Sequence, residues 1–408
     1  VSNAVFAGEL ALDGSLRPIR SAIITAEVAK NQKIKSVYVP AQNAEQAALV
    51  TGVDVFPVEN LKSLFLHLKK EKIIRPIDRS SIKNVSHNHK NAPTIDDIYG
   101  QEQAKRAIQI AVAGRHNILL SGPPGSGKTM LAKSLKNLLP ALSEDEIVEV
   151  TKLHSLGEHT IINNPIVDRP FRSPHHTASR ASIIGGGSKV QPGEISLAHR
   201  GVLFLDELLE YPRTVLESLR QPLEDHEITV SRANGKFNFP ANFLLVSTMN
   251  PCPCGFLGDP EKTCICSQNQ ILNYQKRLSG PLLDRIDLTV SVSRVPHEKL
   301  LNNKVSTKSQ QETFLSDIHK AYSIQRDRYK CSYKYNNDIS SNNVDKITSI
   351  SESAKTFLTN AARKLDLSTR SYFKVIKVSR TIADLEGSTS IETPHIAESL
   401  QYRQISIG

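Results

Sequence analysis

Residues 117–129 read Asn-Ile-Leu-Leu-Ser-Gly-Pro-Pro-Gly-Ser-Gly-Lys-Thr, and this stretch decides the fold. Its second part, residues 122–129, fits the phosphate-binding pattern G-x-x-x-x-G-K-[ST]. That pattern is informative only between a strand and a helix. Here an apolar run, 117–120, precedes it, and a stretch with helical spacing, Met130–Leu139, follows it. The sequence therefore predicts a P-loop in a parallel α/β sheet.

The composition of this loop suits the binding of a nucleotide. Glycine lets backbone N–H groups come close to phosphate oxygens, and the start of the following helix adds the positive end of its dipole. We expect Lys128 to reach the β- and γ-phosphates of ATP and the Thr129 hydroxyl to bind Mg²⁺. The other loop residues that we expect to contact ATP are Gly122, Pro123, Pro124, Gly125, Ser126 and Gly127.

Two further predicted strands carry polar residues at their ends. The apolar run 202–205 ends at Asp206 and Glu207. In P-loop enzymes an Asp in this place holds Mg²⁺, and a neighbouring Glu can polarise the attacking water as a general base. A third run, 243–248, leads to Asn250, whose amide can hydrogen-bond the γ-phosphate or orient the water. We therefore predict that these three side chains contribute to ATP hydrolysis.

The whole chain has the composition of a folded protein with more than one domain. Its 408 residues suggest two or three domains of about 100–200 residues each. Hydrophobic residues make up 39% and charged residues 23%, so a sizeable core is expected. No apolar run approaches the roughly 18 residues of a membrane helix, and no secretory signal is visible. We expect a cytoplasmic protein whose cysteines are reduced or metal-bound.

Changes of pattern along the chain predict its division into segments. Residues 94–293 alternate strand-like and helical runs, as a parallel α/β sheet requires, whereas the spacing from Val344 to Tyr402 is helical throughout. The predicted segments are a small α/β unit at 1–74, a polar linker at 75–93, the α/β core at 94–293, a basic connecting segment at 294–343 and a helical domain at 344–408.

The chain is basic, with a net charge of +10, and much of this charge is gathered in one part. Residues 294–380 hold 17 Lys and Arg against 8 Asp and Glu. Such a segment favours a polyanion such as nucleic acid as partner, while a solvated basic surface is the alternative. Trp is absent and aromatic residues make up only 5%, so base stacking is not expected as the main mode of binding.

Four cysteines form two closely spaced pairs, Cys252 with Cys254 and Cys264 with Cys266. Two glycines and a proline lie between the pairs and allow the chain to fold back. Four thiolates can surround one tetrahedral Zn²⁺. We predict a structural zinc site in an insert at 252–266, because so short a segment cannot form a core and metal would be its main source of order. Free, reduced cysteines are the alternative.

Longer stretches of the chain resemble the magnesium-chelatase-related branch of the AAA+ ATPases. Within that branch they are similar to the bacterial ComM, or YifB, family. The stretches are RPFRSPHHTASRASIIGGG (169–187), PGEISLAHRGVLFLDEL (192–208), LRQPLEDHEITVSRA (219–233), STMNPCPCG (247–255), SGPLLDRIDL (279–288) and STRSYFKVIKVSRTIADLEG (368–387). The resemblance implies an AAA+ core with a C-terminal helical lid.

The resemblance also implies roles for single residues. Arg285 matches the family's arginine finger, which a neighbouring subunit supplies, and Arg370 matches the sensor-2 arginine of the lid. Ile98 and Gln101 fall where this class contacts adenine. A salt-bridged surface arginine is the alternative for Arg285, and a structural arginine is the alternative for Arg370.

For the whole protein the resemblance implies a hexameric ring that hydrolyses ATP and moves along DNA. The implied activity is a helicase that drives branch migration when transforming DNA is integrated. A chelatase-like or chaperone-like ATPase that remodels a protein partner is the competing interpretation, and a binding-only relic is a second.

Residues 227–238 are predicted to form a β-hairpin with its turn at Asn234-Gly235. In related ring helicases such a hairpin touches DNA in the pore, which would place Arg232 and Lys236 on phosphates. A hairpin at a subunit interface is the alternative.

The N-terminal segment, residues 5–30, resembles the C-terminal half of the Lon protease domain. The family carries further residues ahead of this point, so we expect a partial, N-terminally truncated domain. The Lon nucleophilic Ser falls in the missing half, and Ile23 stands where the Lon catalytic Lys would be. Without either partner no Ser–Lys dyad can form, so we expect no proteolysis.

Overall fold

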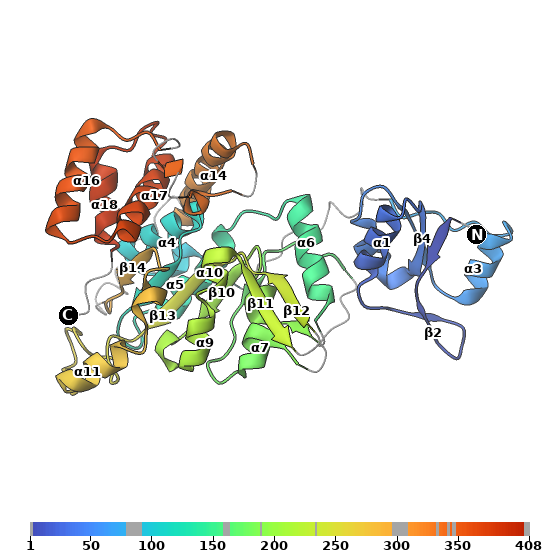
Figure 1. The fold of residues 1–408 in the computed structure, drawn as a ribbon, viewed down its shortest axis with the longest axis horizontal. Helices are drawn as coiled ribbons and strands as arrows, with labels where there is room; N and C mark the ends of the chain where they lie inside the picture. Colours follow the sequence, from blue (N-terminus) through green and yellow to red (C-terminus); the bar gives the residue numbers. More distant parts are fainter. Residues whose placement is uncertain are drawn as a thin grey trace.

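The computed structural model describes residues 3–78, 92–157, 164–187, 190–232, 235–295, 309–331, 334–340, 343–344 and 348–403. Figure 1 shows an N-terminal α/β unit at one end of the molecule, a central α/β domain, and a group of C-terminal helices beside that domain. The mixed α/β class predicted from the sequence is confirmed.

The central domain is built on a five-stranded parallel sheet. Its strand order is β14-β6-β13-β10-β7, and each neighbouring pair is parallel. In that order the strands are Leu288–Ser291, Ile118–Ser121, Leu244–Met249, Val202–Leu205 and Phe171–Arg172. Because β6, β13 and β10 are adjacent and parallel, the residues that follow their carboxyl ends are brought to one edge of the sheet.

Two apolar cores cover the two faces of this sheet. Side chains alternate across a strand, so Leu120 of β6 belongs to one core and Leu119 to the other. Every residue of β10 is buried, which explains why its sequence is a continuous apolar run rather than an alternating one.

Helices pack on both faces. In chain order the helices of the central domain are α4 (Glu102–Gly114), α5 (Lys128–Ser134), α6 (Glu144–Ser155), α7 (Arg180–Ile184), α8 (Glu194–Leu197), α9 (Arg213–Ser218), α10 (Pro222–Asp225), α11 (Gln268–Gln275) and α12 (Gly280–Leu283). Short 3₁₀ turns lie at Ile95–Asp97 (η3), Leu135–Leu138 (η4) and Leu208–Glu210 (η5).

A β-hairpin lies outside the central sheet, between α10 and β13 (Figure 1). Its strands are β11 (Glu227–Arg232) and β12 (Gly235–Pro240), and their register pairs Arg232 with Gly235. The predicted hairpin is present, but Gly235, which is predicted in the turn, is the first residue of β12. Asn234 and the side chain of Arg232 lie outside the described residues, and Lys236 is exposed on β12.

The N-terminal unit has its own three-stranded parallel sheet in the order β1-β4-β5. Its elements are β1 (Ala4–Phe6), β2 (Glu9–Leu10), β3 (Leu16–Arg17), α1 (Ala22–Asn31), β4 (Ser36–Pro40), η1 (Ala41–Asn43), α2 (Ala44–Ala48), β5 (Asp54–Val58) and α3 (Leu61–Leu68). Ile23 of α1 is completely buried in the apolar core of this unit. Lys152 of α6 forms an ion pair with Glu27 of α1, which joins the unit to the central domain.

The C-terminal helices pack against α4 and against one another (Figure 1). They are α14 (Gln310–Tyr329), α16 (Glu352–Lys364), α17 (Thr369–Leu385) and α18 (Thr393–Gln401), with a 3₁₀ turn, η6, at Asn336–Asp338. The buried carboxylate of Asp384 on α17 forms ion pairs with Arg328 of α14 at 2.5 Å and with Arg380 at 3.0 Å. The helix α14 therefore packs with this group, although it lies within the segment expected only to connect. In the described ranges no helix combines the length and the apolar character that crossing a membrane requires.

Candidate nucleotide site

The P-loop joins β6 to α5 at the carboxyl edge of the sheet. Gly125 and Gly127 have φ angles of 78° and 89°, in the left-handed region that glycine adopts without steric cost. Gly122 passes so close to the chain after β14 that a Cβ there would lie 2.0 Å from the carbonyl oxygen of Val292. The φ angles of Gly125 and Gly127 and the close approach at Gly122 explain why these three positions must be glycine.

Lys128 lies over the loop at the first turn of α5. Its ammonium donates to the carbonyl oxygens of Gly122 at 2.7 Å and Pro123 at 2.8 Å, and to Asn250 Oδ1 at 3.3 Å. Burial lowers the pKa of Lys128 below its ordinary value, against the opposing effect of the carboxylates of Asp206 and Glu207. The structure thus brings Lys128, Asn250 and the two acidic residues to one place, as the sequence predicts.

Asp206 lies within hydrogen-bond reach of two hydroxyl groups. Thr129 Oγ1 is 3.2 Å from Asp206 Oδ2, and Thr248 Oγ1 donates to Asp206 Oδ1 at 2.5 Å. The hydroxyl and the carboxylate are hard oxygen ligands of the kind that Mg²⁺ prefers, so the pair fits this metal.

Glu207 has a strained backbone, with a φ angle of 52°. Its N–H donates to Thr248 Oγ1 at 3.0 Å, so the same buried hydroxyl contacts both acidic residues. Non-glycine residues in this conformation cluster at functional sites, where the strain directs a side chain. Thr248 is not predicted from the sequence, because its place beside Asp206 follows from the parallel register of β10 and β13, in which Leu205 lies opposite Ser247.

A cavity of about 320 Å³ lies beside the P-loop. Its walls are formed by Asp97, Ile98, Tyr99 and Gln101, by loop residues 124–127 with Met130, and by Glu261, Arg294 and Val295. Lys128, Thr129 and Asp206 are not among its lining residues. The cavity therefore fits the nucleoside end of a nucleotide whose phosphates lie on the loop. Ile98 and Gln101 are predicted at this place from the sequence, whereas Glu261 and Arg294 are not.

Arg285 and Arg370 lie together, away from this cavity. Both contact the carboxylate of Glu224 on α10: Arg285 through an ion pair, and Arg370 at 3.8 Å. Arg285 Nη1 also donates to the carbonyl oxygen of Pro281 at 2.7 Å. Burial lowers the pKa of Arg285, and the positive charges of Arg370 and Arg220 add to this effect. The structure thus brings the two predicted arginines to one acidic residue and not to the P-loop of their own chain.

The four predicted cysteine ligands converge directly after Asn250. Their sulfur atoms all lie within 4.8 Å of one another. Cys252 Sγ is 3.4 Å from Cys254 Sγ and 3.6 Å from Cys264 Sγ, and the Cys254 N–H donates to Cys266 Sγ at 3.4 Å. Backbone N–H groups of Phe256 and Ile265 lower the pKa of the Cys254 thiol to about 6. A tetrahedral ion with Zn–S bonds of about 2.3 Å separates its sulfur ligands by about 3.8 Å, so this cluster fits zinc.

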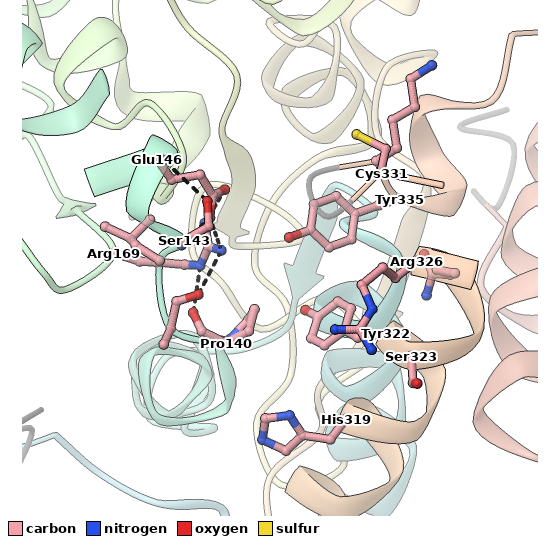
Figure 2. Close-up of a pocket in the computed structure, with 14 residues that line it drawn as sticks. Pro140, Ser143, Glu146, Arg169, His319, Tyr322, Ser323, Arg326, Cys331 and Tyr335 are labelled. Atoms are coloured by element: carbon pink, nitrogen blue, oxygen red, sulfur yellow. Dashed lines mark hydrogen bonds and ion pairs between the residues drawn. The ribbon is translucent and has the colours of Figure 1, made fainter. Parts of the chain in front are cut away.

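A second cavity, of about 300 Å³, lies between the start of α6 and α14 (Figure 2). Figure 2 shows Arg169 directed at Glu146 and Pro140, with Tyr322 and Tyr335 on the opposite side. The guanidinium of Arg169 binds the Glu146 carboxylate at 2.9 Å and donates to the Pro140 carbonyl oxygen at 2.7 Å. The buried guanidinium of Arg169 is thus paired within the chain, with Glu146 of α6 and the carbonyl oxygen of Pro140, which indicates a structural role.

Comparison with known proteins extends the resemblance to nearly the whole chain. The family model of the magnesium chelatase subunit ChlI matches residues 94–300, and the model of its C-terminal part matches residues 308–403. Competence protein ComM of Haemophilus influenzae is 41% identical over 401 residues, which cover 98% of this chain and 77% of that protein. The YifB protein of Salmonella typhimurium is 37% identical over 400 residues, which cover 98% and 76%. The chain belongs to the ComM/YifB family.

The ComM/YifB family is itself related to the chelatases. The magnesium-chelatase 67 kDa subunit of Heliobacterium mobile is 27% identical over 193 residues, which cover 40% of this chain and 28% of that subunit. The predicted AAA+ fold and family are therefore confirmed. Membership of this ATPase family implies ATP and Mg²⁺ as ligands, in agreement with the P-loop, Thr129 and Asp206.

Proposed function

We propose that this protein is an ATP-hydrolysing ring motor on DNA, a ComM-like helicase that promotes branch migration in natural transformation and recombination. The observation that carries the ATPase part is the convergence of Lys128, Asn250 and Glu207 around the P-loop. Lys128 holds the β- and γ-phosphates, and Thr129 with Asp206 holds Mg²⁺. The bound Mg²⁺ neutralises charge on the phosphates. Glu207 takes the proton of the attacking water, and Asn250 orients that water.

The ring is proposed from the position of Arg285 and Arg370. Neither side chain lines the cavity beside its own P-loop, yet both lie on one face around Glu224. We propose that they reach the γ-phosphate of a neighbouring subunit, where Arg285 stabilises the charge of the transition state. A closed homo-oligomer, proposed as a hexamer, supplies every pocket with such a neighbour.

DNA is proposed as the polymer along which the motor moves, because of the exposed cations near the hairpin and on the C-terminal helices. Lys236 is exposed on β12, and Lys320 and Arg326 belong to α14 in the basic segment. Such groups bind phosphates electrostatically and without regard to base sequence, as a motor that moves along DNA requires. We propose that Arg232 also takes part in this contact, and we place the protein in the bacterial cytoplasm, where its DNA substrate lies.

The test is the ATPase rate with and without single-stranded or forked DNA. We expect DNA to raise the rate of the wild-type protein. Lys128→Ala should lose nucleotide binding, whereas Glu207→Gln should keep binding and lose turnover, because only the base is removed. Equal loss of binding in both variants would defeat the role of Glu207. ATP hydrolysis without any stimulation by DNA would instead favour the chelatase-like or chaperone-like ATPase that remodels a protein partner.

Zinc is proposed as the structural metal of the insert 252–266. The four sulfur atoms fit a tetrahedral ion, and the described part of the insert contains no helix or strand that could order it otherwise. Protein purified without chelators should contain about one zinc per chain. Replacement of Cys252 and Cys254 by Ser should remove it.

A further inference from the structure

The insert 252–266 folds back against the nucleotide cavity and forms part of its wall. It begins two residues after Asn250, at the end of β13, and its Glu261 lines the cavity together with Arg294, which follows β14. Gly255 packs so closely on the P-loop that a Cβ there would lie 2.6 Å from Pro124 Cδ. One wall of the cavity beside the P-loop is thus built by the cysteine insert and by a residue that the insert holds.

Arg294 is fixed almost entirely by this insert. Its Nε lies 2.9 Å from the Asp259 carboxylate, whose side chain is 0% exposed, and its Nη1 lies 3.3 Å from Glu261 Oε2. The guanidinium also lies 5.6 Å from the ring centre of Phe256. On the other side its Nη2 donates to the carbonyl oxygen of Pro124 at 3.4 Å. The guanidinium therefore links the insert to the P-loop.

The conformation of Asp259 depends in turn on the fold of the insert. Asp259 Oδ1 accepts hydrogen bonds from the backbone N–H groups of Glu261 at 2.8 Å and Lys262 at 3.1 Å. These bonds are local, and among the insert's residues only Cys252 belongs to the buried hydrophobic core. Without metal the insert has little to offset the entropy of its ordering. Loss of the metal should therefore release Asp259 and, with it, Arg294.

We propose that Arg294 and Glu261 are nucleotide-binding residues, and that the metal in the cysteine cluster controls nucleotide affinity by holding them in place. This inference rests on the proposed ATP site and on the proposed zinc. The cavity fits the nucleoside end, so Arg294 faces the base and ribose and not the phosphates. A guanidinium plane stacks on an aromatic base, and the Glu261 carboxylate accepts a hydrogen bond from a ribose hydroxyl.

The test is equilibrium binding of a fluorescent ADP analogue in Mg²⁺, together with the zinc content of each protein. Arg294→Ala should raise the dissociation constant by about tenfold, as expected for the loss of a guanidinium stacked on an aromatic base. Removal of zinc by a chelator should raise it by a similar factor in the wild-type protein and by much less in Arg294→Ala, because the two changes remove the same contact. Arg17→Ala, which breaks an exposed ion pair with Glu9 in the N-terminal unit, is the matched control.

Asp259→Asn distinguishes the proposed effect from a simple folding defect. It keeps the four cysteines but removes the charge that holds Arg294, so the zinc content should be unchanged while affinity falls as in Arg294→Ala. Wild-type affinity in Asp259→Asn and Arg294→Ala overturns the proposal, as does wild-type affinity after zinc is removed. Lys128→Ala reports separately on the ATP site: if it binds as well as the wild type, the ATP site itself is misplaced. If purified protein contains no zinc, control by the metal is overturned.

Discussion

At the scale of single residues, the hydroxyl of Thr248 organises the acidic pair. It donates to Asp206 at 2.5 Å and accepts from the Glu207 N–H at 3.0 Å, and the residue is only 1% exposed. Thr248→Val keeps the shape of the side chain and removes both hydrogen bonds. We expect kcat to fall by about tenfold to a hundredfold, the usual cost of losing a group that orients a metal ligand.

The affinity for nucleotide should change much less than kcat, because Thr248 lies beside the acidic pair and not in the loop. Thr248→Ser, which retains the hydroxyl, should restore most of the rate. A purely structural role would predict instead that both variants lose thermal stability and nucleotide affinity together. Steady-state kinetics over a range of Mg²⁺ concentrations separates the two cases.

His116 is expected to make folding sensitive to acid. It is completely buried, and its Nε2 contacts Thr381 Oγ1 of α17 at 2.7 Å, where the central domain meets the C-terminal helices. Burial lowers the pKa of His116 to about 4, and the nearby Lys377 acts in the same direction, against the carboxylates of Asp287 and Asp338. Between pH 4 and the ordinary value of 6.5, the unfolded chain therefore binds a proton that the folded chain does not.

The free energy of unfolding contributed by neutral His116 is thus complete above about pH 6.5 and is lost as the pH falls toward 4. The loss over this range amounts to about 3 kcal/mol. Urea unfolding at a series of pH values should show His116→Gln with a shallower dependence than the wild type. His319→Gln, at an exposed position of α14, is the control. Equal slopes in all three proteins would contradict the assignment.

At the scale of elements, the hairpin β11–β12 is the part that we expect to meet DNA. Lys236→Glu reverses one exposed charge on β12. It should weaken binding of single-stranded DNA and reduce the salt dependence of that binding by about one released ion, independently of base sequence. Lys30→Glu makes the same charge change on α1 of the N-terminal unit and should leave binding nearly unchanged. Equal effects of the two variants would indicate only an effect of net charge.

The elements that could be predicted were those with a local pattern. The strands β6, β10 and β13 are buried on both faces, so apolar runs mark them directly, and the P-loop is marked by its glycine motif. The strand β7 has only two residues, Phe171 and Arg172, too few to display any periodicity. The helix α14 lies within the segment predicted to connect two domains, although it packs against α4 and α17, because a local helical pattern does not show which distant helices it will meet.

The residues of the candidate site also fall into two groups, those that a sequence motif predicts and those that it does not. Residues named by a motif, such as Lys128 and Asp206, lie together as expected. Residues that depend on the return of a distant segment were missed. Arg294 reaches Pro124 across 170 positions of sequence, and Glu224 meets Arg285 across 61. No local pattern encodes such contacts, because they arise from the order of strands in the sheet.

At the scale of the whole molecule, we propose that Arg285 and Arg370 act at the nucleotide pocket of a neighbouring subunit. The two arginines come from α17 and from the residues after α12, yet they share the carboxylate of Glu224. Within one subunit, neither arginine lines the cavity beside the P-loop. Catalysis should then require assembly. Arg285→Ala should leave nucleotide binding intact and lower turnover by on the order of 10³–10⁵, the contribution of an arginine finger in other nucleotide hydrolases.

Mixing two inactive variants tests whether the arginine acts between subunits. Arg285→Ala keeps its pocket and lacks the finger, whereas Lys128→Ala keeps the finger and lacks a working pocket. In co-assembled rings some interfaces place an intact finger from one subunit beside an intact pocket of the next. ATPase activity should therefore return in part, and it should rise with the fraction of such mixed interfaces. If the two variants demonstrably co-assemble and the mixture stays as inactive as either parent, Arg285 acts within its own subunit, and the pairing with Glu224 is then its structural role.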